Sequence, residues 1–231
     1  MPVLDPDLLL RAYSIGVFPM ADSRDAPDIY WVEPRKRAII PLDRFRLSRS
    51  LRKTLRTGLF EVTRDRAFAD VVSECARREE TWINEEIEQS YIQLHERGHA
   101  HSVECWQGGE LVGGLYGVRL GSAFFGESMF SLRKDASKVA LAWLVARLIV
   151  GGFRLLDCQF MTEHLRSMGA VEIDQEDYVR FLASLFAGAD GRPPPWAEFG
   201  ALDRLLDSDP GRTVDAPASG CVIAQLLGQT S

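Results

Sequence analysis

The amino-acid sequence predicts an α+β protein whose sheet is mixed but largely antiparallel. Three stretches that favour strands, 99–106, 111–119 and 123–130, follow one another with only short Gly-containing turns between them. Strands joined in this way pair as an antiparallel meander. A long apolar helix over 136–150 then leads to a further strand at 153–158, and this order of elements defines the predicted fold class.

The residues before this sheet are expected to form a small N-terminal α+β domain over residues 1–58. Asp5-Pro6 is typical of a helix start and Gly16 of a helix end. The composition changes from basic to mixed near Gly58, where we place the boundary. In chain order, the elements expected here are a helix up to Gly16, short strands at 29–32 and 38–40, and a basic helix over 48–57.

The second expected domain spans residues 59–188 and contains the meander. Asn84 is expected to cap a helix that ends at Gly98, because an Asn side chain accepts hydrogen bonds from the free N–H groups of a first turn. The other elements expected here are a strand at 59–63 and helices at 67–77, 162–168 and 174–186. After Gly188 the sequence is rich in Pro and Gly and loses its periodicity, so residues 189–231 are expected to form an irregular C-terminal tail.

The net charge of −6 conceals a basic segment at residues 35–56, which contains nine basic residues and one acid. Within it, Arg49, Arg52, Lys53 and Arg56 have the spacing i, i+3, i+4, i+7, which places them on one face of the expected helix. Such a stripe repels itself unless a partner neutralises it, and nucleic-acid phosphates would do so. The pattern therefore favours contact with a phosphate backbone, and a solvated helix face is the alternative it leaves open.

Several classes of protein are not indicated. The four cysteines are widely spaced without a Cys-x-x-Cys pair, which argues against a disulfide framework or a zinc site. His99 and His101 share a strand face, but no carboxylate or thiol stands at a spacing that would complete a metal site. The longest apolar run, 139–153, is shorter than the roughly 20 residues that span a bilayer and contains Arg147. Because no secretory signal is evident, we expect a cytoplasmic protein that binds neither a metal nor a membrane.

The strand at 153–158 ends in polar residues. On an extended chain, Asp157 and Gln159 would face the same side about 7 Å apart, with Cys158 facing away. Burying a carboxylate and a carboxamide without partners would cost several kcal/mol. The pair therefore indicates either a satisfied structural network or a site that meets a polar ligand.

The order of elements after residue 59 is similar to that of acetyltransferase-like (GNAT-like) domains. Members of that class that use coenzyme A hold its pyrophosphate on backbone N–H groups of a Gly-rich loop between the last meander strand and the next helix. Here that stretch, 131–138, contains no glycine. Coenzyme A is therefore not expected as an acyl donor, and no cofactor is predicted.

Several motifs resemble the leucyl/phenylalanyl-tRNA protein transferase family and occur in that family's order. The most specific are Gly126-Glu-Ser-Met-Phe-Ser131 and, some thirty residues later, Asp157-Cys-Gln159. The resemblance extends from residue 17 to about residue 186. The other motifs are Val17-Phe-Pro-Met20, Trp31 with Glu33-Pro34, Thr81-Trp-Ile83, Gly98-His-Ala-His-Ser-Val-Glu104, Leu111-Val-Gly-Gly-Leu-Tyr-Gly117 and Ala136-Ser-Lys138.

The resemblance implies a reaction and its partners. Enzymes of this family transfer Leu or Phe, and less readily Met, from aminoacyl-tRNA to proteins with an N-terminal Arg or Lys, which marks the acceptors for the N-degron pathway. Asp157 and Gln159 match the family's catalytic positions; we expect Gln159 to bind the attacking amine and Asp157 to orient Gln159. We expect a monomer without a cofactor. The alternatives are an aminoacyl-tRNA-dependent transferase with another acceptor, such as a peptidoglycan precursor or a lipid, or a tRNA-binding module without turnover.

The resemblance also implies which residues bind the substrate. Trp82 and Trp31 match aromatic positions near the 3′ adenosine of the tRNA. Leu115 stands where the family often has Met, and Thr162 stands where we would expect Asn. By strand alternation, Glu127 and Met129 are expected on one face of their strand, with Phe124, Ser128 and Phe130 on the other. The expected substrate-binding residues are Glu127, Trp82, Trp31, Phe124, Ser128, Met129 and Leu115, and the stripe of Arg49, Arg52, Lys53 and Arg56 is expected to bind tRNA.

Overall fold

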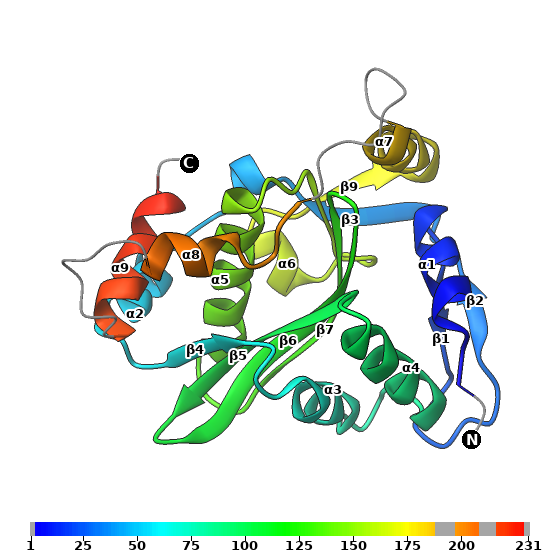
Figure 1. Ribbon diagram of the computed structural model, residues 1–231, viewed down its shortest axis with the longest axis horizontal. Coiled ribbons are helices and arrows are strands. Elements are labelled where there is room, and N and C mark those ends of the chain that lie inside the picture. The colour runs from blue at the N-terminus through cyan, green and yellow to red at the C-terminus, as the bar shows by residue number, and fades with distance from the viewer. Residues whose placement is uncertain (1–2, 188–196, 208–215, 229–231) are drawn as a thin grey trace.

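The computed structural model describes residues 3–187, 197–207 and 216–228 of the 231-residue chain. A seven-stranded sheet crosses the molecule in the order β4-β5-β6-β7-β8-β3-β9, and helices cover both of its faces (Figure 1). Its strands are β3 (Lys36–Ile40), β4 (Glu61–Arg64), β5 (Ala100–Gln107), β6 (Glu110–Leu120), β7 (Ala123–Ser131), β8 (Leu155–Asp157) and β9 (Val171–Asp174). A separate two-stranded sheet pairs β1 (Phe18–Met20) with β2 (Tyr30–Val32).

The predicted fold class is confirmed. Strands β5 to β7 form the expected antiparallel meander, and β4 pairs antiparallel with β5 at its edge. Helix α5 (Ala136–Val150) connects β7 to β8, and these two strands are parallel. The parallel pairing covers only the register from Ala123 opposite Leu155 to Phe125 opposite Asp157. Strand β7 continues to Ser131 with no β8 partner, so the two strands part as they do in acetyltransferase-like domains.

Two hydrophobic cores lie on the two faces of the sheet. The core on one face, called here the α5-side core, packs α5 with α2 (Arg49–Thr57), α8 (Ala201–Asp207) and α9 (Ala216–Leu226). The other, the α4-side core, packs α1 (Pro6–Ser14), α3 (Phe68–Ala76), α4 (Glu85–Glu96) and α7 (Gln175–Ala187). Helix α6 (Glu163–Ser167) and the short 3-10 helix η1 (Leu42–Arg44) complete the elements that the structure describes.

Helix starts and ends follow the expected side-chain chemistry. The Ser48 hydroxyl accepts a hydrogen bond from the Leu51 N–H at 3.2 Å, and the Asn84 carboxamide oxygen accepts one from the Ile87 N–H at 2.9 Å. Helix α2 ends at Gly58, which has a φ of 62°, a conformation that costs glycine little. The basic helix and the helix capped by Asn84 that the sequence predicts are both present.

Strand β3 lies in the central sheet. It pairs with β8 on one side, where Ile40 is opposite Leu156, and with β9 on the other, where Arg37 is opposite Ile173. Residues 36–57 therefore share a sheet and a hydrophobic core with the chain beyond residue 58. The expected domain boundary at Gly58 thus does not coincide with a division of the sheet or of the core. Pairing between strands more than a hundred residues apart leaves no local sequence signal, which is why the boundary could not be read from composition.

The expectation of an irregular C-terminal tail is wrong for the parts of it that the structure describes. Helices α8 and α9 both pack on the α5-side core, where Leu202, Ile223 and Leu227 are fully buried. Both helices are short, and Pro217 and Gly220 within α9 hide its periodicity. The Pro-rich stretch 193–196 lies outside the described residues. Within the part of the chain that is described, no helix is long and apolar enough to cross a membrane.

Close packing between α9 and α2 generates a stability prediction. A Cβ added to Gly220 would lie 1.9 Å from the carbonyl oxygen of Leu55, which is backbone and cannot move aside. Gly220→Ala should therefore lower the free energy of unfolding by about 1–3 kcal/mol, measured by urea unfolding. Gly200→Ala is the control, because its Cβ would meet side-chain ends and no backbone, with Arg64 Nη2 at 3.3 Å and Asp203 Oδ2 at 4.0 Å. Equal stability of both variants and the wild type would contradict the helix contact.

Candidate active site

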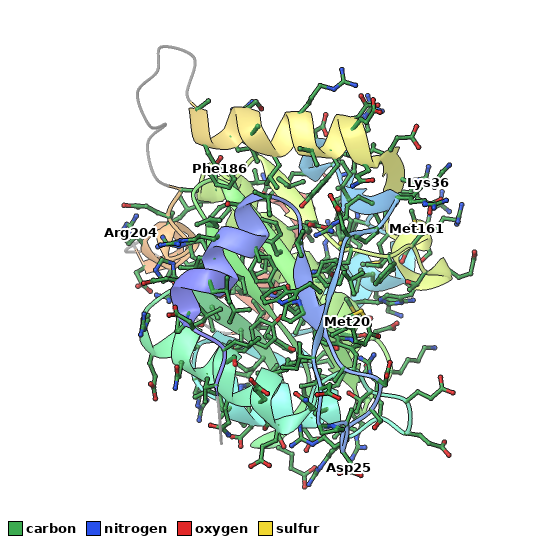
Figure 2. The ribbon with its side chains drawn as sticks, turned by 90° about the vertical axis from the view of Figure 1, so that its right-hand side faces the viewer. Met20, Asp25, Lys36, Met161, Phe186 and Arg204 are labelled. Carbon is green, nitrogen blue, oxygen red and sulfur yellow. The ribbon has the colours of Figure 1, made fainter. Side chains whose placement is uncertain are left out.

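A cavity of about 920 Å³ opens where β7 and β8 part. This volume is in the range of small-molecule binding sites. Its apolar wall comes from β6, β7, α5 and β8. The buried polar groups Glu127 and Gln159 line one end, and the lining also includes Glu74, Arg77, Arg78 and His164. Figure 2 looks onto this side of the molecule and labels Met20, which lines the cavity from β1, and Met161, which follows Gln159 and Phe160 in the chain. The structure thus brings strand ends and the N-terminal β1 together around one space.

A β-bulge places Glu127 in this cavity. Strand β6 pairs Tyr116 with Ser128 and then Gly117 with Gly126, so that Glu127 is the extra residue of β7. Gly117 permits this close approach, because a Cβ there would lie 2.3 Å from the carbonyl oxygen of Phe125. A bulge of one residue reverses the alternation of side chains beyond it.

The alternation predicted for β7 is consequently wrong. Phe124 packs in the α5-side core, where its ring stacks on Phe199, whereas Phe130 lies in the α4-side core. Met129 contacts the α5-side core, and Glu127 reaches tyrosines of the opposite side. A bulge in the middle of a strand has no signature in the sequence. The prediction therefore applied the two-residue alternation to the whole of β7.

Asp157 is fully buried at the end of β8, and every bond it makes is structural. Its carboxylate accepts hydrogen bonds from Arg37 Nε at 2.9 Å and Arg37 Nη2 at 2.7 Å, from the Tyr178 hydroxyl at 2.6 Å and from the Gln159 backbone N–H at 2.8 Å. Asp157 is not among the residues that line the cavity. The expectation that it orients Gln159 has a geometric basis in that last hydrogen bond.

Arg37 is the cation of this network. It is 1% exposed, donates to the carbonyl oxygen of Gly16 at 2.8 Å and lies between the rings of Phe18 and Tyr178, with 4.7 and 4.6 Å from Cζ to the ring centroids. Burial disfavours its charge, but the carboxylate of Asp157 outweighs burial and raises the pKa of Arg37. Burial and the charge of Asp157 also raise the pKa of Tyr178. Arg37 is therefore a charged, fully paired residue in the interior.

Gln159 does not continue the extended strand. Its φ of 54° lies in the left-handed region, so the expected arrangement with Asp157 on one face of a strand is wrong. The turn directs the carboxamide toward the cavity, where Nε2 donates to Glu127 Oε1 at 3.1 Å. The Ala38 N–H of β3 holds the Gln159 carbonyl oxygen at 3.0 Å. The described residues donate no hydrogen bond to the carboxamide oxygen, which leaves it for a ligand.

Glu127 ends a chain of buried hydroxyl groups. Tyr91 donates to Glu127 Oε2 at 2.9 Å, and the hydroxyls of Tyr91 and Tyr13 lie 2.6 Å apart. Burial raises the pKa of Glu127 to about 7, with the charge of Asp157 adding to the rise and the tyrosine hydrogen bonds and Arg37 opposing it. This carboxyl group is thus partly ionised near neutral pH.

The other predicted substrate residues divide into two groups. Trp82, Leu115, Ser128 and Met129 line the cavity. Phe124 and Trp31 are absent from its lining: Phe124 is fully buried in the α5-side core. Trp31 is 40% exposed on β2, opposite Pro19 of β1.

Trp31 thus stands beside the strand that carries the lining residues Phe18 and Met20. Sequence reasoning placed both of these in a family motif without giving either a role. It missed Arg37, Tyr91 and Tyr178 entirely, because a buried arginine or tyrosine has no signature in a single sequence.

The basic stripe lies on α2, on the far side of the sheet from Glu127. Arg49, Lys53 and Arg56 are exposed, and Arg52 is half-buried beside Gly228 at the end of α9. Leu51 and Leu55, on the opposite face of the helix, are buried. Among the described residues, the recorded ion pairs include none made by these four basic side chains. The stripe is therefore a largely exposed basic surface without an acidic partner in the described part of the chain.

His95 and His101 have structural contacts, whereas His164 lines the cavity. His101 Nδ1 lies 2.9 Å from Asp65 Oδ2 and its ring stacks on Phe199, while the ring of His95 stacks on Phe68. Across the described residues, no group of three His, Cys, Asp or Glu side chains is arranged to hold a metal ion.

A sheet that parts between two parallel strands over an apolar cavity with buried polar groups at one end defines an acetyltransferase-like domain. Two family models match the chain: leucyl/phenylalanyl-tRNA protein transferase over residues 39–183 and the N-terminal domain of the same transferase over residues 3–35. The chain belongs to this family. The N-terminal match ends at residue 35, directly before β3, and the other match begins at residue 39, within β3.

Curated relatives agree with the family models. A leucyl/phenylalanyl-tRNA–protein transferase of Rhizorhabdus wittichii is 62% identical over the whole of both chains. One of Zymomonas mobilis is 54% identical over 91% of this chain and 81% of the relative. A solved structure, that of L-PGS from Bacillus licheniformis, aligns at 13% identity and a TM-score of 0.38 over 95% of this chain and 70% of that chain, a likeness too slight to bear on the site.

The buried ion pair generates a prediction. Arg37→Met should lower the free energy of unfolding by about 3–5 kcal/mol, because it leaves the Asp157 charge buried without its counter-ion. The double variant Arg37→Met with Asp157→Leu should recover part of this loss in urea unfolding. Recovery is incomplete because Tyr178, Gly16 and Gln159 still lack a partner.

The control is Arg180→Met, which breaks an exposed pair with Asp177 and should cost less than about 1 kcal/mol. A single Arg37 variant as stable as this control would show that the interior pair does not hold the site together.

Proposed function

We propose that this chain transfers Leu or Phe, and less readily Met, from aminoacyl-tRNA to the α-amino group of proteins that begin with Arg or Lys, and that this marks the acceptors for N-degron degradation. The observation that carries the proposal is the cavity whose apolar interior ends at Gln159 and Glu127. We place the reaction in the cytoplasm because its donor is aminoacyl-tRNA, and we expect the chain to act as a monomer.

The apolar part of the cavity suits a large aliphatic or aromatic side chain. Leu115, Met129, Leu144 and Leu156 line it from β6, β7, α5 and β8. Transfer of such a side chain from water into this lining contributes about 25 cal/mol per Å² of apolar surface. A small or charged amino acid would gain little or would lose its hydration. The lining therefore favours Leu, Phe and Met as the residues transferred.

The cavity mouth supports a role for the tRNA 3′ end. Trp82 lines it beside Met20 and Phe18, and an indole ring can stack on an unpaired base for about 1–3 kcal/mol. The solvent-facing stripe on α2 supplies charge for the tRNA backbone, which positions the donor without reading its sequence.

The chemistry requires positioning more than activation. An aminoacyl ester is already activated, and an α-amine with a pKa near 8 is partly neutral at neutral pH. Holding amine and ester together contributes up to roughly 7–11 kcal/mol in well-oriented reactions. We assign the free carboxamide oxygen of Gln159 to the attacking amine, and Asp157 to fixing the turn that presents it, through the Gln159 backbone N–H. No cofactor has a part in this scheme.

The function is tested by transfer of radiolabelled Leu or Phe from charged tRNA to a peptide that begins with Arg. The wild-type chain should label this peptide and not one that begins with Gly. Gln159→Ala should lower kcat about 100-fold, since a small displacement of reacting groups has an effect of this size. Asp157→Asn should also lower activity, because it loosens the Gln159 turn. Salt-sensitive tRNA binding without any transfer would instead identify a tRNA-binding module.

A second experiment tests the stripe. Replacing Arg49, Arg52 and Lys53 by Ala should raise the KM for charged tRNA and reduce the salt dependence of tRNA binding. The variant makes fewer phosphate contacts, so its binding releases fewer counter-ions from the tRNA. A minimal aminoacyl-adenosine donor should be used almost as well as before.

The matched control removes three exposed arginines from other surfaces, Arg11, Arg97 and Arg180, with the same change in net charge. An equal effect of both triple variants on tRNA use would show that the stripe acts only through the net charge of the protein and not through specific phosphate contacts. Equal losses with tRNA and with the minimal donor would exclude phosphate contact.

A further inference from the structure

The buried polar network at the end of the cavity contains two carboxylates and one cation. Arg37 bonds both oxygens of Asp157 and the carbonyl oxygen of Gly16 and has no hydrogen bond to Glu127. The recorded ion pairs of the described residues include none for Glu127. One carboxylate is thus neutralised by the protein, and the other is not.

The same two carboxylates differ in access to the substrate. Glu127 lines the cavity and is 9% exposed, whereas Asp157 is completely buried behind Gln159 and outside the lining. Asp157 also accepts four hydrogen bonds or more, from Arg37, Tyr178 and the Gln159 N–H. Among the described residues, Glu127 accepts hydrogen bonds from Gln159 Nε2 and Tyr91, and Tyr13 lies close enough to influence it as well. A carboxylate has about four lone-pair sites, so Glu127 can accept a further proton donor from the cavity and Asp157 cannot.

We propose that Glu127, and not Asp157, is the catalytic residue that takes the proton of the attacking amine and returns it to the leaving ribose oxygen. This inference rests on the proposed transferase function and deepens it. The neighbouring Gln159 would hold the amine on its carboxamide oxygen while its Nε2 stays bonded to Glu127, which places the amine beside the carboxylate.

The step balances without any further reactant. The amine nitrogen forms a bond to the ester carbonyl carbon, and one N–H proton passes to Glu127. As the tetrahedral intermediate collapses, the bond between the carbonyl carbon and the ribose oxygen breaks. The same proton then passes from Glu127 to that oxygen, which leaves as a hydroxyl group. Glu127 ends each cycle in the ionisation state in which it began.

The surroundings of Glu127 suit a group that both accepts and donates a proton. Burial raises its pKa to about 7, which matches the working pH of such a group. The groups that face it are Tyr13 of α1, Tyr91 of α4, Tyr116 of β6, Asp157 of β8 and Arg37 of β3. Burial raises the pKa of all three tyrosines well above 10, and Arg37 stays charged. None of these four groups can therefore take the proton near neutral pH.

The raised pKa has a consequence for stability with a defined sign. The pKa of Glu127 is higher in the folded chain than its ordinary value of 4.5, so the folded chain binds this proton more tightly than the unfolded chain. The resulting stabilisation is complete below pH 4.5 and is lost as the pH rises to about 7. Glu127→Gln removes this loss, since a carboxamide stays neutral and can still accept from Gln159 and bond Tyr91. The variant should therefore melt at a temperature at least equal to that of the wild type at pH 8.

The test is a pH profile of single-turnover transfer from Phe-tRNA to an Arg-starting peptide between pH 5.5 and 9. Wild-type transfer should fall on the acid side with two ionisations, that of the amine near 8 and that of Glu127 near 7. Glu127→Gln should lower kcat by about 100-fold or more, which is the usual effect of losing a general base. It should keep the KM for Phe-tRNA within about 3-fold and retain only the amine ionisation.

Two further variants sharpen the result. Glu127→Asp keeps a carboxylate with a shorter reach and should restore part of the rate together with the second ionisation. Glu88→Gln makes the same chemical change at a different buried glutamate, which lies on α4 and outside the cavity lining. This variant should transfer at the wild-type rate. Difference infrared spectra should show a protonated carboxyl group titrating near pH 7 in the wild type and not in Glu127→Gln.

A Glu127→Gln enzyme with wild-type kcat, or with both ionisations retained, would overturn the inference. Two results together would also overturn it: a melting temperature of Glu127→Gln at pH 8 below that of the wild type, and a lowered rate of Glu127→Asp without the second ionisation in its pH profile. Both are expected of a glutamate with a purely structural role. Absence of transfer by the wild type would instead refute the proposed function itself.

Discussion

The site depends on one interior ion pair, that between Arg37 and Asp157. Removing two charges from water is costly, and the cost is offset only when the remaining donors and acceptors are also satisfied. Here Tyr178, Gly16 and the Gln159 N–H complete the bonding of the pair. These partners come from α7, from the turn after α1 and from the segment after β8. Because the buried pair needs all of these partners, it holds four distant parts of the chain together around one end of the cavity.

The cavity itself is a consequence of how β7 is paired. Over residues 123–125 this strand has partners on both sides, and beyond Phe125 it keeps only β6. The bulge at Glu127 then turns the strand, so that Met129 faces the α5-side core while Glu127 meets the tyrosines of the opposite side. One strand therefore supplies both apolar lining and a buried carboxylate to the same cavity. A regular strand would have placed Glu127 and Met129 on the same face.

Local signals in the sequence predicted the parts of the fold that local forces determine. The meander, the caps at Ser48 and Asn84 and the basic helix follow from turn residues, capping side chains and periodicity. Resemblance identified Gln159 and Glu127 as site residues. Arg37 was counted among the nine basic residues of a charged segment, and nothing in that segment distinguishes a buried arginine from exposed ones. The insertion of β3 between β8 and β9, the bulge and the two C-terminal helices all depend on contacts between residues far apart in the chain.

The division of charge between the two carboxylates explains why the network suits an amine substrate. If the protein neutralised both, the network at this end of the cavity would offer no carboxylate to attract an amino group or to receive its proton. If it neutralised neither, two like charges would be buried together, and the folded state would carry both desolvation costs. Supplying one arginine for two acids stabilises Asp157 as a fixed anchor and leaves Glu127 poised between its two protonation states. An ionised Glu127 can attract the incoming amino group, and it stays free to accept one N–H proton when that group attacks as the neutral amine.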